Sequence, residues 1–325
     1  KKTGSCKVLV VTGCMAQRYK NEIIEEVPEV DAVLGTTSYG DILKAIREAM
    51  EGKHFQEFKD IDYLPEKLGK RVLTTGGHFG YLKIAEGCDK HCTYCIIPKL
   101  RGKFRSVPME RLIEQAKEMA EEGVKELILV AQETTVYGTD IYGKKSLHIL
   151  LKELCKIKGI RWIRVLYCYP EEIYDELIQT MKEEKKICHY LDLPIQHASD
   201  RILKRMGRRT TQAELVEIVN KLRREIPDIV LRTTLISGFP GETQEDHEEL
   251  MSFVDEMEFD RLGVFTYSPE EDTPAATMPD QVAEEVKEAR RDEIMELQQE
   301  ISYDKGTDRI GQELLVMIEG KVADE

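Results

Sequence analysis

Three cysteines lie close together in the sequence and carry its strongest chemical signal. One charged loop contains thiols at Cys88, Cys92 and Cys95, which is a C-x3-C-x2-C spacing. A structural zinc site is closed by four ligands, whereas three thiolates on a 4Fe-4S cluster leave one iron without a protein ligand. The array therefore predicts an iron-sulfur cluster with one iron open to a small molecule.

His91 is the side chain inside this array that could change the interpretation. As a fourth ligand it would close the site, and the chain would then be a non-catalytic iron- or zinc-binding module. We expect His91 to be an ordinary polar loop residue instead. The three cysteines could also be buried apolar residues, but a loop so rich in charge is not expected in the core. Metal analysis after anaerobic reconstitution separates the alternatives, because a cluster brings several irons and the module a single zinc.

The composition indicates a reducing compartment. The 325 residues include eight cysteines and no apolar run as long as a membrane span, so we expect a cytoplasmic protein without membrane contact. The formal charge of -14 argues against a surface built to coat nucleic acid. Two basic islands are either solvated surface or local phosphate contacts. They comprise Lys90, Lys99, Arg101, Lys103 and Arg105, and later Arg201, Lys204, Arg205, Arg208 and Arg209.

The elements that must position the cysteines alternate between strand and helix. From Tyr81 onward this alternation predicts βαβ units and a parallel sheet. Six strands can be placed, near 81–85, 124–131, 161–167, 190–193, 229–236 and 262–267. They are too few for a closed eight-stranded barrel, so the predicted fold class is α/β with an open partial (βα)6 TIM-like barrel. The amphipathic segment 281–300 is predicted to be a closing helix.

Polar residues recur directly after the predicted strands, where catalytic groups of (βα) barrels gather. The candidates are Gln132, Glu133, Gln196, His197, Arg232, Gly238 and Tyr267. Each has a structural alternative: the first two could cap a loop, the histidine could be hydrogen-bonded within its loop, and the arginine could be ion-paired. The glycines between Ser237 and Glu242 favour a sharp turn where backbone approaches a flat ligand closely.

The N-terminal part is predicted to be a small β-α-β-α unit. Strands are expected at 7–11 and 31–34, each followed by helical spacing. Cys14 lies at the first strand-to-helix turn, where a helix N-terminus favours a thiolate. The remaining cysteines are predicted to be small core residues, namely Cys6, Cys155, Cys168 and Cys188.

The chain divides into four predicted segments. They are an α/β unit (1–52), a linker (53–77), the barrel domain (78–305) and the start of a β module (306–325). The last segment rests on one strand-like run from Leu314 to Ile318, which has no partner strand after it. Because the chain also opens on Lys1 instead of Met, we expect it to be a fragment of a longer protein.

Several further motifs resemble those of the radical S-adenosylmethionine (SAM) methylthiotransferases. The cysteine array is followed by Ile96-Ile97-Pro98 and by the stretch from Arg101 to Ser106. Supporting stretches are 129–135, 193–199, 232–242 and 265–271. The resemblance runs over nearly the whole chain and is greatest to the branch that modifies an aspartate of small-subunit ribosomal protein twelve. Val107 departs from that branch, whose members often carry arginine there.

The resemblance implies a domain order and two clusters. Members of the family have an N-terminal domain with three cysteines for a second 4Fe-4S cluster, a central radical SAM domain and a C-terminal TRAM β-barrel. Cys14 matches the last of those three cysteines, the other two would precede Lys1, and the TRAM module would stop after its first strand. The implied SAM contacts are Tyr94, Gln132, Glu133, Arg232, Gly238 and Tyr267, with Gln196 and His197 as weaker candidates for SAM or substrate.

The implied reaction uses two SAM molecules per product. One would chelate the open iron and, on reduction, give a 5'-deoxyadenosyl radical that takes a hydrogen from the β-carbon of the aspartate. The second would methylate a sulfur on the second cluster, and this methylthio group would pass to the carbon radical. The implied partners are the ribosomal protein and an electron donor such as flavodoxin or ferredoxin. The alternative is a tRNA methylthiotransferase acting on a modified adenosine, whose affinity should fall steeply with salt.

Overall fold

The computed structural model describes residues 4–65, 72–74 and 77–320. The chain splits into two units. The N-terminal unit comprises 1–72, 86–90 and 96–105, and the C-terminal unit comprises 73–85, 91–95 and 106–325. The division passes through the cysteine loop, because Cys88 belongs to the first unit whereas Cys92 and Cys95 belong to the second.

A three-stranded parallel sheet with the order β1-β2-β3 organises the N-terminal unit. Its elements are β1 (Val10–Thr12), α1 (Cys14–Tyr19), α2 (Glu22–Glu26), β2 (Ala32–Leu34), the 3-10 helix η1 (Tyr39–Asp41), α3 (Ile42–Met50), β3 (Phe55–Glu57) and α4 (Ile97–Arg101). The central strand β2 is buried on both faces, since Val33 packs with Ala16 of α1 and Leu34 packs with Ala45 of α3. Both predicted strands of this unit are thus confirmed.

The third strand of this sheet corrects the prediction of a linker from 53 to 77. β3 pairs in parallel with β2, so that Phe55 lies opposite Ala32 and Glu57 lies opposite Leu34. Recognition of a strand by alternation needs about four residues or more. β1 and β2 are equally short but lie in apolar runs, whereas β3 is Phe-Gln-Glu and has a single apolar residue, so the sequence alone does not reveal it.

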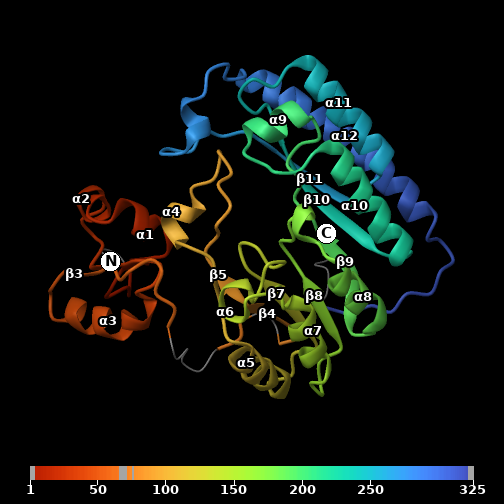
Figure 1. Cartoon of the computed structure of the whole chain (residues 1–325). Coiled ribbons are helices and arrows are strands. Elements are labelled where there is room, and N and C mark those ends of the chain that lie inside the picture. The colour runs from red at the N-terminus through yellow and green to blue at the C-terminus, as the bar shows by residue number, and fades with distance from the viewer. Residues whose placement is uncertain (1–3, 66–71, 75–76, 321–325) are drawn as a thin grey trace. The chain divides into compact units, whose positions relative to one another are not determined.

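Six parallel strands form the sheet of the C-terminal unit, in the order β11-β10-β9-β8-β7-β4. They are β4 (Phe79–Lys83), β7 (Glu126–Val130), β8 (Trp162–Val165), β9 (Ile187–Asp192), β10 (Val230–Ser237) and β11 (Arg261–Thr266). Figure 1 shows these strands in the interior of the unit, with its helices outside. The predicted α/β class with a parallel sheet is confirmed, and so are the six predicted strands.

The connections between the strands supply the helices of this unit. The helices are α5 (Met109–Glu121), α6 (Thr139–Tyr142), α7 (Leu147–Cys155), α8 (Asp175–Glu183), α9 (Asp200–Arg205), α10 (Gln212–Glu225), α11 (Gln244–Met257) and α12 (Glu284–Thr307). Shorter elements are β5 (Ala85–Glu86), β6 (Arg105–Ser106), η2 (Pro170–Glu172) and η3 (Pro274–Thr277). α5 buries Leu112, Ala116 and Met119, and a Cβ at Gly80 of β4 would overlap the Met119 methyl group. The apolar stripe of α5 therefore packs directly on the sheet.

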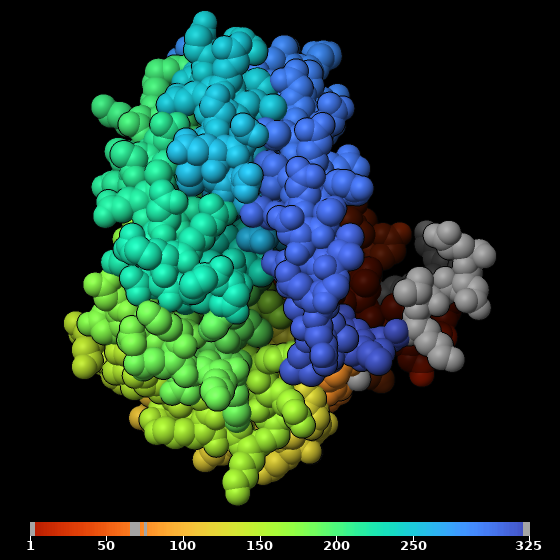
Figure 2. All heavy atoms as spheres, turned by 90° about the vertical axis from the view of Figure 1, so that its right-hand side faces the viewer, coloured from red at the N-terminus to blue at the C-terminus, as the bar shows by residue number. Residues whose placement is uncertain are grey.

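The predicted closing helix is present as α12 and continues beyond its predicted end. It buries Ile294 and Ile301, and its Gln298 amide donates to the Phe259 carbonyl oxygen at 2.8 Å. In Figure 2 α12 runs beside α11 along one face of the unit. None of the helices in the described ranges is long and apolar enough to cross a membrane.

The end of the chain corrects a second prediction. Residues 312–320 form neither helix nor strand in the structure, although Leu314–Ile318 is predicted to be a strand. Leu315 and Ile318 are 81% and 86% exposed. A strand without a partner leaves its backbone hydrogen bonds unmade, so the apolar run does not by itself produce an element.

Candidate functional site

The cysteine loop is fastened to the C-terminal turn of α9 in the C-terminal unit. The Thr93 N–H donates to the Met206 carbonyl oxygen at 2.9 Å, and the Thr93 hydroxyl donates to the Arg205 carbonyl oxygen at 2.9 Å. Gly207 has a φ of +72°, and a Cβ there would lie 2.9 Å from the His91 carbonyl oxygen. The close approach of these two backbones therefore requires glycine.

Cys88 lies in the N-terminal unit and is fixed by backbone hydrogen bonds. Its N–H donates to the Gly102 carbonyl oxygen at 3.1 Å, and its sulfur accepts the Lys90 N–H at 3.4 Å. A Cβ at Gly87 would overlap the Lys103 carbonyl oxygen, so only glycine fits directly before the cysteine. Hydrogen bonds to sulfur are one of the means by which proteins tune iron-sulfur clusters.

The donor chemistry of the loop fits an iron-sulfur cluster. Cys88 and Cys92 are each 7% exposed, Cys95 is half-buried, and thiolates are the ligands that hold such clusters. In the ranges that the structure describes, no group of three or more histidine, cysteine, aspartate and glutamate side chains is arranged as a metal site. His91 is exposed. Ligation of a cluster by the three thiols therefore stays a prediction.

Two candidate residues follow β7 directly. Glu133 is 1% exposed, and its carboxylate accepts the Thr135 N–H at 3.2 Å as well as the Thr135 hydroxyl. Gln132 beside it is half-buried. The loop-capping alternative is thus present for Glu133, and a SAM contact of either residue stays a prediction.

Arg232 forms an ion pair within the sheet. Its Nη1 donates to the Asp192 carboxylate at 2.6 Å, and the two residues lie opposite one another in the pairing of β10 with β9. The Asp192 side chain is 6% exposed and the Arg232 side chain 39% exposed. The guanidinium therefore compensates a buried carboxylate, which is the structural alternative to a SAM contact.

The loop after β9 holds the two weaker candidates. Gln196 has a φ of +74°, a strained conformation that is enriched at functional sites. Its N–H donates to the Thr234 carbonyl oxygen at 2.9 Å, and its carbonyl oxygen accepts the Ile236 N–H at 2.8 Å. His197 is fully buried, and its Nδ1 accepts the Ser199 N–H at 2.9 Å. His197 is therefore hydrogen-bonded within its loop, which is the structural alternative to a functional role.

Glu242 is the centre of the turn after β10, a role that the sequence did not indicate. Its Oε2 accepts the N–H groups of Gly238 and Phe239 at 2.8 and 3.2 Å and lies 3.5 Å from His197 Nε2. Its Oε1 accepts from Arg290 of α12 at 2.8 Å. Burial acts to raise the pKa of Glu242, but His197 and Arg290 outweigh burial and the pKa is lowered. The carboxylate is therefore ionised at neutral pH.

Gly238 is required by the packing of α12. It has a φ of +69°, and a Cβ there would overlap the Lys287 side chain. The Lys287 ammonium in turn donates to the Tyr267 carbonyl oxygen at 2.9 Å. In the structure it is α12 that approaches this glycine closely, and a ligand contact through its backbone stays a prediction.

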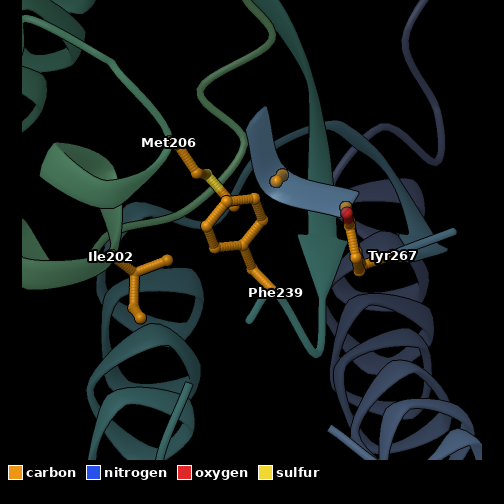
Figure 3. Packing of buried hydrophobic residues seen from close by; sticks show 5 residues of the cluster. Ile202, Met206, Phe239 and Tyr267 are labelled. Carbon is orange, nitrogen blue, oxygen red and sulfur yellow. The ribbon is translucent and has the colours of Figure 1, made fainter. Parts of the chain in front are cut away.

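Phe239 is the centre of a buried apolar cluster, shown in Figure 3 with Ile202, Met206 and Tyr267. The rings of Phe239 and Tyr267 meet edge to face with centroids 5.3 Å apart, and Tyr94 of the cysteine loop packs against the same cluster. The Tyr267 hydroxyl is buried and has no hydrogen-bond partner among the described residues. Because buried polar groups are nearly always satisfied, this hydroxyl fits a polar contact from a bound ligand.

Two residues beside Cys92 had no site role assigned to them from the sequence. The Tyr169 hydroxyl lies 3.7 Å from the Cys92 sulfur, and the Arg208 guanidinium stacks over the Tyr169 ring, 4.4 Å from its centroid. The Arg208 side chain is 1% exposed, so this member of the second basic island is not solvated surface. A signal for Tyr169 exists in its position after the third predicted strand, where functional groups of barrels gather.

Cys14 begins α1 in the N-terminal unit, at the strand-to-helix turn where it was predicted. Arg101 of α4 donates from Nε to the Cys14 sulfur at 3.1 Å and from Nη1 to Glu86 at 3.3 Å. A role of Cys14 in a second cluster stays a prediction. The four cysteines predicted to be core residues differ: Cys168 is buried, Cys155 and Cys188 are half-buried, and Cys6 is exposed in the irregular segment before β1, so the prediction is wrong for Cys6.

Several arginines of the two basic islands form contacts within their own unit, although Arg201 is 48% exposed. In the first island Arg105 forms an ion pair with Asp62. In the second, Arg201 forms an ion pair with Asp246, and Arg205 donates to a backbone carbonyl oxygen at 2.9 Å. These arginines serve the fold, which leaves fewer cations to contact phosphates.

Comparison with known proteins identifies the family. The profile of the Radical SAM superfamily matches residues 82–254. Ribosomal protein uS12 methylthiotransferase RimO from Lachnoclostridium phytofermentans is 65% identical over 325 residues, which are 100% of this chain and 74% of that protein. RimO from Clostridium perfringens is 54% identical over 321 residues, which are 98% of this chain and 72% of that protein.

Solved structures share the fold at low sequence identity. The cobalamin-dependent SAM radical enzyme OxsB, with aqua-cobalamin and SAM bound, has a TM-score of 0.55 and 14% identity, over 91% of this chain and 43% of that one. Coproporphyrinogen III oxidase (HemN) from Escherichia coli, a Radical SAM enzyme, has a TM-score of 0.52 and 19% identity, over 69% of this chain and 53% of that one. The superfamily match contains the cysteine loop, and the relatives align along the whole chain. The chain therefore belongs to the radical SAM superfamily and, within it, to the RimO family of ribosomal protein uS12 methylthiotransferases.

Proposed function

We propose that this protein adds a methylthio group to the β-carbon of an aspartate in ribosomal protein uS12. The observation that carries the proposal is the 65% identity to a RimO protein, which extends over the whole chain. The family is one of enzymes that transfer sulfur-containing groups, and its radical SAM domain implies a 4Fe-4S cluster and SAM as cofactors.

The cluster would be held by Cys88, Cys92 and Cys95. When bound, the cluster and SAM supply the one-electron radical chemistry that breaks an unactivated C–H bond, which no side-chain acid or base can supply. The protein's own part is to bind the cluster and SAM and to exclude water from them. Packing of Tyr94 on the Phe239 cluster supports this role, because it provides an apolar surface next to Cys95.

SAM would bind at the C-terminal ends of the strands from β7 to β11. The buried Tyr267 hydroxyl supports this location, because it has no protein partner among the described residues. Gln132 would contribute its amide, whereas Glu133 and Arg232 are already engaged by Thr135 and Asp192. The remaining candidates are Tyr94 and Gly238 for SAM, and Gln196 and His197 as weaker ones for SAM or substrate.

Finer features belong to the same proposal. A second 4Fe-4S cluster would take Cys14 as one ligand, and electrons would come from flavodoxin or ferredoxin. The six-stranded sheet would curve as an open partial (βα)6 barrel, preceded by part of an N-terminal α/β domain (1–52). Residues 306–325 would begin a TRAM β-barrel. We assign the enzyme to the cytoplasm because its proposed substrate is a ribosomal protein.

Charge argues against tRNA as the acceptor. The sequence has a formal charge of -14, and Arg105, Arg201 and Arg205 of the basic islands are engaged inside the protein. Recognition of tRNA needs cations that can neutralise phosphates. The ribosomal protein is therefore the favoured acceptor.

Replacement of Cys92 by alanine in the full-length, anaerobically reconstituted enzyme tests the proposal. We expect Cys92→Ala to lose the iron-dependent absorption of the radical SAM cluster together with SAM cleavage, because one of three proposed ligands is gone, whereas the absorption of the second cluster should remain. Cys155→Ala is the matched control, since Cys155 is a half-buried cysteine at the end of α7, and it should retain both. Retention of both by Cys92→Ala would overturn the site.

The acceptor is tested by mass spectrometry of uS12 and of tRNA after incubation with the wild-type enzyme. We expect methylthio transfer to an aspartate of uS12 and none to tRNA. Transfer to tRNA alone would overturn the proposed acceptor and leave the radical SAM site intact.

A further inference from the structure

We propose that Tyr169 and Arg208 are positioning residues that raise the reduction potential of the cluster on Cys92. The inference rests on the proposed function, because it requires that cluster. Its basis is a series of contacts in the C-terminal unit. The Tyr169 hydroxyl lies 3.7 Å from the Cys92 sulfur, and the Arg208 guanidinium carbon lies 4.4 Å from the centroid of the Tyr169 ring.

Arg208 is buried to a degree that is rare for a charged group. Its side chain is 1% exposed, and the Glu171 carboxylate lies 3.6 Å away. Nη2 donates to the Pro194 carbonyl oxygen at 3.2 Å, whereas Nε and Nη1 have no hydrogen-bond partner among the described residues. A buried cation with two unsatisfied donors is costly unless negative charge compensates it. A cluster ligated by thiolates beside Cys92 would supply such charge.

The guanidinium remains charged in this environment. Burial acts to lower the pKa of Arg208, but Tyr94, Glu171 and Tyr169 outweigh burial, and the pKa is raised. The guanidinium is therefore positively charged at neutral pH. Its attraction to a neighbouring negative group is strong because little solvent screens it.

The two residues act on the sulfur in the same direction. A hydroxyl that donates to a thiolate reduces the negative charge on the sulfur, and a nearby cation stabilises the state that has gained an electron. Hydrogen bonds to the sulfurs, net charge and solvent exposure are factors that set cluster potentials. Tyr169 and Arg208 should therefore both make the cluster easier to reduce.

Backbone hydrogen bonds fix the position of the residue that carries the cation, Arg208. The Arg208 N–H donates to the Leu203 carbonyl oxygen at 2.9 Å, and the preceding turn accepts from Thr93 of the cysteine loop. The segment that carries Arg208 is therefore the segment that holds the loop. The fold therefore fixes the backbone of Arg208 relative to the cysteine loop, and the contacts with Tyr169 and the Pro194 carbonyl oxygen hold the guanidinium.

Potentiometric titration followed by electron paramagnetic resonance tests the inference. The full-length enzyme carries Cys14→Ala in every sample, so that the second cluster lacks a proposed ligand and does not obscure the signal. Arg208→Gln removes the charge, and Tyr169→Phe removes the hydroxyl but keeps the ring. We expect each to lower the equilibrium constant for reduction about tenfold, which is about 59 mV for a one-electron couple.

Two further variants separate charge from packing. Arg208→Lys keeps the positive charge and should retain most of the wild-type potential. Arg209→Gln is the matched control, because Arg209 is adjacent in sequence but exposed, and its potential should equal that of the parent. If Arg208→Gln fails to fold, Tyr169→Phe decides the question, since it removes a single oxygen.

Iron content distinguishes failure of the inference from failure of the proposed function. A parent enzyme without a cluster, or a Cys92→Ala variant that keeps one, would overturn the proposed function. A Cys92-dependent cluster with the same potential in Arg208→Gln, Tyr169→Phe and Arg209→Gln would overturn the inference alone.

Discussion

Replacement of Glu242 by alanine should strongly destabilise the C-terminal unit. The Glu242 side chain is 0% exposed, and its carboxylate accepts from the backbone of Gly238 and Phe239 and from the Arg290 side chain. One carboxylate thus joins the turn after β10 to α12. Alanine would leave these three donors buried without their acceptor.

The loss of the ion pair with Arg290 should dominate the change in unfolding free energy. The Arg290 side chain is 8% exposed, and removal of one partner from a buried ion pair costs about 3–5 kcal/mol. Each buried N–H left without an acceptor adds about 1–3 kcal/mol unless water reaches it. We therefore expect Glu242→Ala to lose at least about 4 kcal/mol, and Glu242→Gln, which keeps an acceptor but no charge, about 2–3 kcal/mol.

Urea unfolding, followed by the fluorescence of Trp162, measures this loss. Trp162 is the one tryptophan of the sequence and begins β8, so it reports on the C-terminal unit. Glu288→Ala is the control, since Glu288 is an exposed acid on α12, and it should change stability by less than about 0.5 kcal/mol. The double variant Glu242→Gln, Arg290→Met should lose less than the sum of its single variants. A loss below about 1 kcal/mol for Glu242→Ala would refute the reasoning.

Two further predictions use urea unfolding in the same way. Asp246→Asn should lower stability at pH 7, by about 1 kcal/mol after allowance for solvent screening, but not near pH 2. Burial acts to raise the pKa of Asp246, yet hydrogen bonds from the Thr243 backbone and from Arg201 outweigh burial and lower it to about 2. The stabilisation by the Asp246 carboxylate is thus full above the usual aspartate pKa of about 4 and is lost as the pH falls toward 2. If the unfolding free energies of Asp246→Asn and wild type fell equally between pH 7 and pH 2, this prediction would be wrong. Gly238→Ala should cost more than Gly143→Ala, although both positions have a φ of +69°, because a Cβ would overlap α12 only at Gly238. The backbone strain of alanine at positive φ should cost about 1–2 kcal/mol of unfolding free energy at Gly143. At Gly238 the overlap with α12 should add about 1–3 kcal/mol. Equal losses of stability in the two variants would show that α12 moves aside for the methyl group.

The sheet could be predicted from the sequence because its strands are long enough to show their pattern. In β10 the burial alternates strictly from Val230 to Ser237, and each strand of the C-terminal unit is separated from the next by helical periodicity. β3 has no such pattern, because it has a single apolar residue, whereas the equally short β2 is apolar throughout. The run from Leu314 to Ile318 has a strand-like composition, but a partner strand is needed to form it.

The candidate site could be predicted in location but not in the use of each polar group. The residues after the strands do lie at the C-terminal ends of the sheet, as parallel βαβ topology requires. Which of them are already engaged depends on contacts between distant parts of the chain. Arg232 binds Asp192, 40 residues away, and Cys92 contacts Tyr169, 77 residues away. No local pattern encodes such pairs. The positions of Tyr169 and Glu242 after their strands are visible in the sequence, but their contacts and those of Arg208 are not.

The buried Tyr267 hydroxyl, which has no hydrogen-bond partner among the described residues, is held rigidly by its surroundings. The Tyr267 N–H donates to the Ser237 carbonyl oxygen at 2.8 Å, and its carbonyl oxygen accepts from Lys287 at 2.9 Å. Its ring is held edge to face by Phe239. Because backbone and ring are both fixed, the hydroxyl cannot move to find a protein acceptor, and only water or a ligand can satisfy it. Under the proposed function, a polar group of SAM that displaced such a water would meet a donor already in position, so that little free energy of binding would be spent on ordering the side chain.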